Sequence, residues 1–179
     1  MRIAIFSSAE NNFSPENREI SLAVVHYLRQ FNVTLVTGGS SGIPAFMVEK
    51  YKGLGGKTVM FSPDKNMREH MKREDNHKSL EFYDEIFYGD GFTDRSIEMI
   101  RYVDGAISLN GRTGTLCESL IAIEESLPLV VIDSTGGISE HFSTIMGFTN
   151  KQPYGFLGVG SSYGNQIDKL ISHIKKQSL

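Results

Sequence analysis

Short apolar runs recur along the chain and alternate with segments whose apolar residues return every three or four positions. Continuous runs are typical of buried strands, and the spaced pattern is typical of amphipathic helices. In the first half of the chain, runs at 3–6, 33–36 and 58–61 flank helical patterns at 15–30 and 43–51. This order of strand, helix, strand, helix and strand predicts a parallel sheet with right-handed crossovers.

The second half of the chain continues the alternation. Strands are predicted at 86–88, 105–109, 129–132 and 156–159, and helices at 93–103, from about 116 to 123, and at 167–174. Continuous apolar strands are expected where helices cover both faces of a sheet. We therefore expect an α/β fold with three layers, a doubly wound, mostly parallel sheet with helices on both faces, formed by a single domain spanning 1–179.

Two stretches depart from this pattern. The segment 64–78 is dense in charged residues, which favours a solvated helix or loop over a mobile lid. The stretch 136–154 mixes apolar and polar residues without a clear period, so no element is assigned to it.

Composition suits a soluble globular α/β protein, with 40% hydrophobic residues, 22% charged residues and 18 glycines in 179 positions. The formal net charge of −3 gives no global electrostatic reason to bind nucleic acid or a membrane surface. We therefore expect neither partner. The first six residues turn polar too soon for a signal peptide, and a lone cysteine excludes an internal disulfide, so we expect the cytoplasm.

Few chemically distinctive side chains stand in recognisable groups. The five histidines are scattered without metal-ligand spacing, so we expect no metal. Cys117 is expected to be a buried, inert thiol. The first strand ends in serines rather than in the glycine fingerprint of a dinucleotide site, and no P-loop is present.

Small polar residues and glycines close three of the predicted strands. In a doubly wound sheet such loops gather at one edge, where ligands bind. Two facing glycine loops favour binding of a phosphate or nucleotide over tight turns alone. The candidate binding residues are Ser7, Ser8, Gly38, Gly39, Ser40, Ser41, Gly42, Asn110, Gly111, Arg112, Thr113, Gly114 and Thr115.

The last of these loops leads into a helix, and the start of a helix attracts anions through its free N–H groups and its dipole. Glu118 follows Thr115 at the spacing of a capping box, so its carboxylate is either a cap or a chemical group. Arg95 has a similar alternative, since it can pair with Glu98 along an exposed helix face. From the residues alone, both alternatives stay open.

The stretch 95–118 resembles the signature of the LOG-type phosphoribohydrolases, long labelled possible lysine decarboxylases. That signature has an arginine in a helix, a methionine, a second arginine and an aspartate, an apolar strand, and then P-G-G-x-G-T-x-x-E. The matching residues are Arg95, Met99, Arg101, Asp104, Gly111, Gly114, Thr115 and Glu118. Two positions depart from the signature, with Asn110 in place of the proline and Arg112 in place of the second glycine.

The resemblance implies a Rossmann-like homodimer that hydrolyses the N-glycosidic bond of an AMP-like or cytokinin-like nucleoside 5′-monophosphate. It gives the catalytic roles to Arg95 and Glu118, with the phosphate held by the glycine loops and no cofactor required. Arg112 could bind the phosphate through its guanidinium. It could equally fill the pocket and leave a non-catalytic nucleotide-binding or cofactor-binding protein, such as a molybdenum-cofactor carrier of the same superfamily.

Overall fold

One parallel sheet forms the centre of the protein, which we describe from a computed structural model for residues 1–73, 80–148 and 154–177. Within these residues, seven strands run in the order β4-β3-β2-β1-β5-β6-β7, and every neighbouring pair is parallel. The strands are β1 (Arg2–Phe6), β2 (Thr34–Thr37), β3 (Lys57–Ser62), β4 (Glu85–Tyr88), β5 (Gly105–Leu109), β6 (Leu129–Ile132) and β7 (Phe156–Gly160). The predicted fold class is confirmed.

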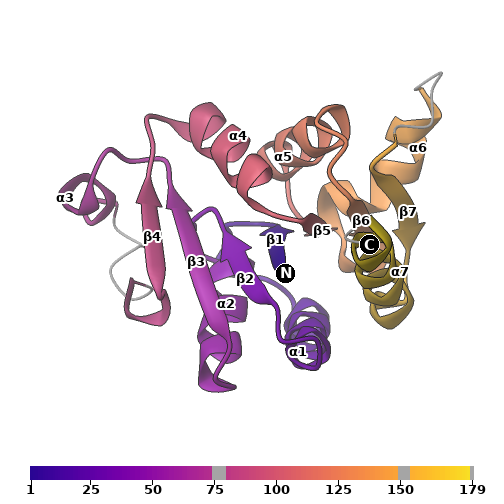
Figure 1. Cartoon of the computed structure of the whole chain (residues 1–179), viewed down its shortest axis with the longest axis horizontal. Helices are drawn as coiled ribbons and strands as arrows, with labels where there is room; N and C mark the ends of the chain where they lie inside the picture. The colour runs from indigo at the N-terminus through magenta and orange to yellow at the C-terminus, as the bar shows by residue number, and fades with distance from the viewer. Residues whose placement is uncertain (74–79, 149–153, 178–179) are drawn as a thin grey trace.

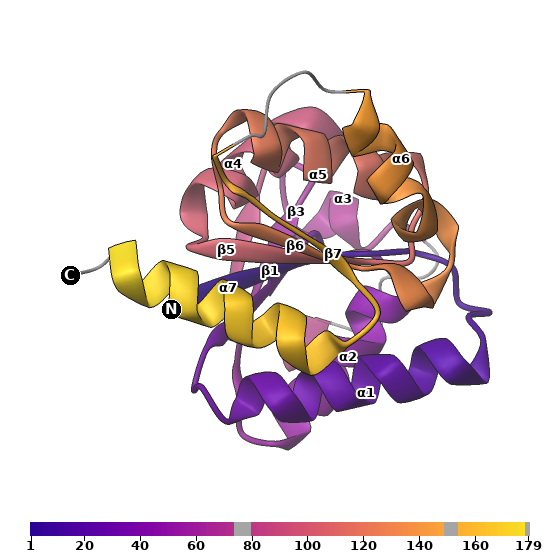
Figure 2. The same ribbon diagram turned by 90° about the vertical axis from the view of Figure 1, so that its right-hand side faces the viewer.

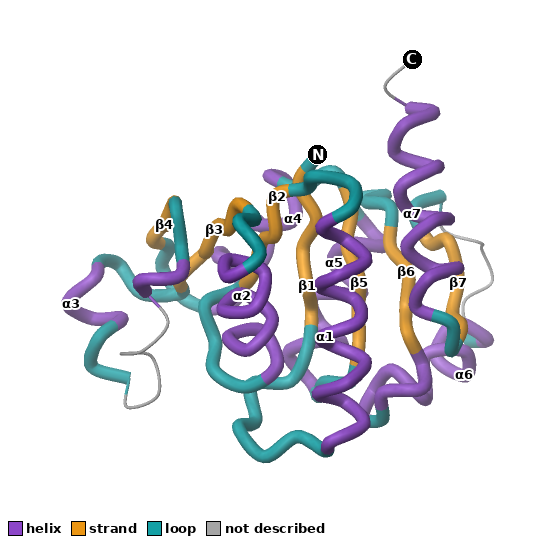
Figure 3. The backbone as a smooth tube through the Cα atoms, turned by 90° about the horizontal axis from the view of Figure 1, so that it is seen from below, coloured by secondary structure: helices purple, strands orange, loops and turns teal. Residues whose placement is uncertain are grey.

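Helices cover both faces of the sheet, which gives the three layers seen in Figures 1 and 2. One face carries α1 (Pro15–Arg29), α2 (Ile43–Gly53) and α7 (Tyr163–Gln177), and these three lie in front of the strands in Figure 3. The other face carries α4 (Phe92–Tyr102), α5 (Thr113–Glu124) and the short α6 (Phe142–Gly147). The remaining short elements are α3 (Met67–His70), η1 (Leu80–Phe82), η2 (Asp133–Thr135) and η3 (Gly137–His141).

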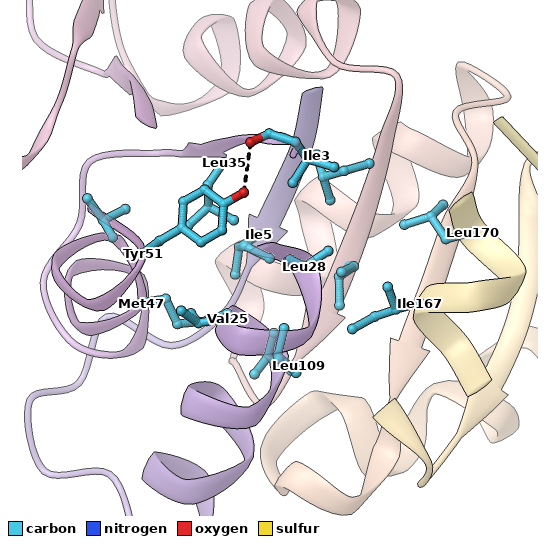
Figure 4. Packing of buried hydrophobic residues seen from close by; sticks show 14 of the residues in the cluster. Ile3, Ile5, Val25, Leu28, Leu35, Met47, Tyr51, Leu109, Ile167 and Leu170 are labelled. Carbon is cyan, nitrogen blue, oxygen red and sulfur yellow. Dashed lines mark hydrogen bonds between the residues drawn. The ribbon is translucent and has the colours of Figure 1, made fainter. Parts of the chain in front are cut away.

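Alternate residues of each central strand pack on opposite layers, as the period of a strand requires. Ile3 and Ile5 of β1 belong to the core beneath α1, α2 and α7, shown close up in Figure 4. Ala4 and Phe6 belong to the core beneath α4, α5 and α6. In the first core, the buried Tyr51 hydroxyl donates a hydrogen bond of 2.8 Å to the carbonyl of Val33, which satisfies the polar end of an otherwise apolar side chain.

The strand order creates a switch point beside β1. The chain winds outward from β1 to β4 and then returns to place β5 on the other side of β1. The helix after β1 lies on one face and the helix after β5 on the other (Figure 1). The connections leaving these two strands therefore diverge, and ligands of open α/β sheets bind in the crevice that such divergence leaves.

Several expectations need correction or completion. In the charged segment 64–78, most of the described residues are exposed, as a solvated helix or loop requires, and among them only His70 is fully buried. Residues 74–79 lie outside the described chain. The stretch 136–154 contains η3 and α6, with 149–153 again outside the described residues. Cys117 is exposed rather than buried, because it lies on the side of α5 opposite the buried residues Thr115, Ser119 and Ala122. None of the helices described has the length and apolar character that crossing a membrane demands.

Candidate functional site

A cleft of about 320 Å³ opens at the switch point, beyond the carboxyl ends of β1, β2 and β5. Its walls come from the loops after these strands, from the first turn of α4 and from the first two turns of α5. Of the residues predicted from the sequence, Ser7, Ser8, Ser40, Arg95, Arg112, Gly114, Thr115 and Glu118 line the cleft. Ala9, Glu10 and Phe92 line it as well and were not predicted.

Arg95 and Glu118 form an ion pair in the wall of the cleft. Nη1 of Arg95 lies 3.1 Å from Oε1 of Glu118, and each residue is only 8% exposed. Arg95 is therefore not a surface arginine paired with Glu98. The helices α4 and α5 lie side by side on one face of the sheet (Figure 1), and their packing brings the two side chains together.

Glu118 does not cap its helix. The helix α5 begins at Thr113, so Thr115 lies within its first turn, and the N-cap residue Arg112 makes no side-chain capping bond. The Glu118 carboxylate instead meets Arg95 and, more distantly, the Ser96 hydroxyl at 3.5 Å. Burial raises the pKa of Glu118, and the Arg95 guanidinium opposes this only in part.

The glycine loop after β2 supports the cleft rather than lining it. A Cβ at Gly38 would lie 1.3 Å from Nη1 of Arg95, so the missing side chain makes room for the guanidinium. Gly39 and Gly42 have φ values of +68° and +72°, and a Cβ at Gly42 would lie within 2.6 Å of the backbone after β1. Ser41 donates a hydrogen bond of 2.7 Å to the carbonyl of Ala9, which joins the two loops. Within this loop only Ser40 reaches the cleft.

Asn110 turns the chain after β5 and fastens it away from the cleft. Its φ of +53° is a left-handed conformation that asparagine tolerates and proline cannot adopt. Its amide N–H donates to Thr135 Oγ1 at 2.6 Å, and its side-chain oxygen accepts from the N–H of Gly111 at 2.6 Å. These groups of the predicted binding residues Asn110 and Gly111 are therefore occupied by hydrogen bonds within the protein.

The first turn of α5 offers backbone donors to the cleft. The first backbone hydrogen bond of this helix joins the N–H of Leu116 to the carbonyl of Arg112 at 2.9 Å. The amides of Thr113, Gly114 and Thr115 precede that bond, at the end of the helix where its dipole is positive. A Cβ at Gly114 would meet no atom within 4 Å, so space is open above this turn.

An ion pair joins the two sides of the mouth of the cleft. Arg112, at the start of α5, binds the carboxylate of Glu10 in the loop after β1, and both side chains are exposed. The guanidinium therefore lies at the rim and does not fill the interior. Glu10 stands two residues after the predicted serines, and Phe92 directly follows the turn at 89–91, yet neither position has a sequence signal of its own.

Other residues of the LOG-type signature lie outside the cleft, in the core or in ion pairs at the surface. Met99 is fully buried in the core, Arg101 pairs with Glu125 at 3.2 Å, and Asp104 pairs with Arg2 at 3.1 Å. These charged pairs border a larger hollow of about 700 Å³ near the amino ends of the strands. That hollow lacks the strand-end loops and the helix start, so we assign the site to the smaller cleft.

Two buried polar atoms of cleft-lining residues have no hydrogen-bond partner among the described residues. They are Nε of Arg95 and Oγ of Ser7. Buried polar atoms without partners are uncommon in native proteins and call for an explanation such as an absent ligand. No group of three histidine, cysteine, aspartate or glutamate residues that could hold a metal ion occurs in the described parts of the chain.

Comparisons of structure support the fold assignment. The X-ray structure of TM1055 superposes with a TM-score of 0.76 at 22% identity, covering 96% of this chain and 98% of that one. The molybdenum cofactor binding protein of Rippkaea orientalis gives 0.73 at 17% identity, covering 99% and 97%. DNA processing protein A of Helicobacter pylori, which binds single-stranded DNA, gives 0.70 at 19% identity, covering 97% and 81%.

The last of these structures corrects one expectation. We expected no nucleic acid partner because the chain carries a net charge of −3. That inference is wrong, since a protein of this same fold has a single-stranded DNA binding mode. Net charge sums over the whole surface, whereas binding depends on the local potential and on the donors at the site.

In sequence, no curated protein matches the chain. The profile of the SLOG cluster4 family matches residues 1–157, which is most of its length. The chain therefore belongs to the SLOG cluster4 family, within the Rossmann-like SLOG superfamily.

Proposed function

We propose that this member of the SLOG cluster4 family binds a nucleoside 5′-monophosphate, or a cofactor of that chemical class, and holds it without cleaving it. One observation carries the proposal: the buried Arg95 guanidinium and the first turn of α5 line the same cleft at the switch point of the sheet. A helix start is a source of affinity for a phosphate, and a buried guanidinium can donate hydrogen bonds to the sugar hydroxyls beside it.

The size and lining of the cleft agree with such a ligand. Its volume of about 320 Å³ falls at the lower end of the range of roughly 300–1,000 Å³ that is usual for small-molecule sites. The phosphate would lie over Gly114 and Thr115, beside the free amides of the first turn of α5, with Arg112 at the rim of the cleft. The sugar would then lie beside Arg95 and Glu118, because these side chains form the adjoining wall.

Two features favour binding without turnover. Arg112 stands where the LOG-type signature has glycine, and its contact with Glu10 spans the mouth through which a leaving base would pass. Burial also raises the pKa of Glu118, which weakens it as a carboxylate that must stay ionised to stabilise a cationic transition state. The relatives compared above include a cofactor-binding protein and a DNA-binding protein, which is consistent with a binding role.

The test is calorimetric titration of the intact protein with AMP, ribose 5-phosphate and inorganic phosphate, followed by chromatography of the recovered AMP. We expect saturable binding of AMP and its recovery intact. A short single-stranded oligonucleotide is titrated in parallel, because a protein of this fold binds single-stranded DNA. Failure of every phosphorylated probe to bind would overturn the proposal.

Hydrolysis of the N-glycosidic bond is the second candidate, and the Arg95–Glu118 pair favours it. Cleavage passes through an oxocarbenium-like state, which the Glu118 carboxylate could stabilise while Arg95 keeps that carboxylate ionised and oriented. Adenine and ribose 5-phosphate in the recovered solution, and their loss in Glu118→Gln with AMP still bound, would establish this function in place of the first.

A further inference from the structure

A phenylalanine is exposed at the edge of the cleft. Phe92 is 59% exposed although it lines the cleft, and it is the first residue of α4 after Gly91, whose φ is +102°. Most other aromatic rings of this layer pack together, as the stacked pair of Phe61 and Phe87 does at 4.8 Å between centroids. The Phe92 ring contributes little to the core, so its place at the cleft needs another explanation.

Two guanidinium groups lie close to the Phe92 ring. The guanidinium carbon of Arg73 lies 4.8 Å from the ring centroid, and that of Arg95 lies 5.9 Å from it. Arg73 is itself held by Asp64, with Nη2 2.9 Å from Oδ1. Cation–π contacts of this kind restrict the ring, which reduces the conformational entropy that a ligand stacked on it would cost.

Phe92 and Arg95 also lie one helical turn apart on α4, so they share one side of the helix. The Ser96 hydroxyl donates to the Phe92 carbonyl at 2.8 Å, which ties this turn together. The cleft thus has charged and polar walls inside and one aromatic surface at its rim. A nucleotide whose phosphate lies at α5 and whose sugar lies at Arg95 would bring its base to this ring.

We propose that Phe92 is the platform on which the planar heterocyclic base of the ligand stacks. The inference rests on the proposed nucleotide-binding function and names the part of the ligand that the rim recognises. Aromatic side chains stack on every nucleobase, because each base has a π-face, and the contact discriminates little between bases. The platform therefore selects ligands that carry a planar ring over sugar phosphates that lack one.

The protein contains no tryptophan, so Phe92→Trp introduces a single fluorophore at the platform while keeping an aromatic face. We expect AMP to quench its emission and to bind about as tightly as to the parent protein, whereas ribose 5-phosphate binds without quenching. Phe148→Trp is the matched control, because Phe148 is exposed at the end of α6 and does not line the cleft. AMP should leave the emission of that variant unchanged.

Phe92→Ala measures how much the ring contributes to the affinity for AMP. We expect AMP affinity to fall about 10-fold and ribose 5-phosphate affinity to stay the same, since only AMP carries a base. Three results would overturn the platform while leaving phosphate binding in place. They are an equal loss of affinity for both ligands in Phe92→Ala, no loss of affinity for either, or equal affinity of the parent protein for both. If neither ligand binds the parent protein, the nucleotide-binding function itself fails, and the platform with it.

Discussion

The guanidinium of Arg95 occupies the space that a side chain at Gly38 would need. A Cβ built on Gly38 lies 1.3 Å from Nη1 and 2.6 Å from Cζ of Arg95. The glycine at the end of β2 is therefore required by a residue of α4, far along the chain. The room left at Gly38 lets the Arg95 guanidinium lie where it meets Glu118, so the site depends on a position that does not line the cleft.

We predict that Gly38→Ala displaces Arg95 and weakens the native state. Overpacking of this kind costs about 1–3 kcal/mol, and the flexible guanidinium is the part that must move. The free energy of unfolding, measured in urea, should fall by that amount, and affinity for AMP should fall with it. Combining the change with Arg95→Ala should make the alanine at 38 nearly neutral, because the obstacle is then gone.

Gly53→Ala is the matched control for this substitution. Gly53 is the last residue of α2, and a Cβ there meets no atom within 4 Å. We expect its effect on stability to stay within about 1 kcal/mol, in the favourable direction, because alanine is the better helix former. A Gly38→Ala protein as stable as Gly53→Ala would contradict the steric role.

The buried ion pair gives a second prediction. Removing one partner, by Glu118→Ala or Arg95→Ala, leaves a charge in the wall of the cleft without its counter-ion. Such losses are about 3–5 kcal/mol in dry interiors, and we expect about 3 kcal/mol here because the cleft admits water. The measurement is the urea midpoint of each single variant with its m-value.

The double variant Arg95→Met/Glu118→Met, compared with Arg95→Met and Glu118→Met made singly, tests the cause. Two apolar side chains of similar volume leave no uncompensated charge, so we expect this protein to be more stable than either single variant. Losses that simply add would show that the two side chains act independently, contrary to the 3.1 Å contact between them.

His70 gives a prediction about pH. The ring is fully buried, Nδ1 lies 2.8 Å from the Ser62 hydroxyl, and Nε2 has no partner among the residues that the structure describes. Burial lowers the pKa of His70 below 6.5, and the nearby carboxylate of Asp64 opposes this without reversing it. The unfolded chain therefore binds more protons than the native one just below pH 6.5, so stability falls as the pH is lowered through this range.

Urea unfolding from neutral pH down to about pH 5 measures this effect. We expect His70→Gln to flatten the pH dependence, because glutamine does not titrate. His26→Gln is the control, since His26 is exposed on α1, and it should keep the parent slope. A parent slope that persists in His70→Gln would assign the pH dependence to other groups.

The sequence predicts the strands and helices well where burial alone determines their bounds. The strand Leu129–Ile132 has the predicted bounds, because its apolar run is covered on both faces. The stretch 136–154 could not be assigned, because contacts with distant segments hold its short turns. One of them is the hydrogen bond of 2.8 Å from the Ser139 hydroxyl to the carbonyl of Asn110. Periodicity carries no information about such contacts.

The site is only partly visible in the sequence. Arg95 and Glu118 stand out through the spacing of a motif, although their contact depends on how α4 packs against α5. Phe92 and Glu10 follow different strands, and only the strand order brings them to one cleft. The sequence also does not show why residue 38 must be glycine, because nothing in a strand-end loop indicates that the Arg95 guanidinium packs against it.

The last prediction concerns the ion pair between Arg112 and Glu10 at the mouth of the cleft. A phosphate at the start of α5 would compete with the Glu10 carboxylate for Arg112 and would be repelled by it. Glu10→Gln should therefore tighten AMP binding several-fold, and Arg112→Ala should weaken it, with a smaller salt dependence in the second variant. Both changes should alter stability by less than about 1 kcal/mol, because the pair is exposed. Glu49→Gln, which removes another exposed carboxylate paired with Lys50, should leave AMP affinity unchanged. Equal affinities in the parent protein and Glu10→Gln would show that Glu10 does not compete with the ligand.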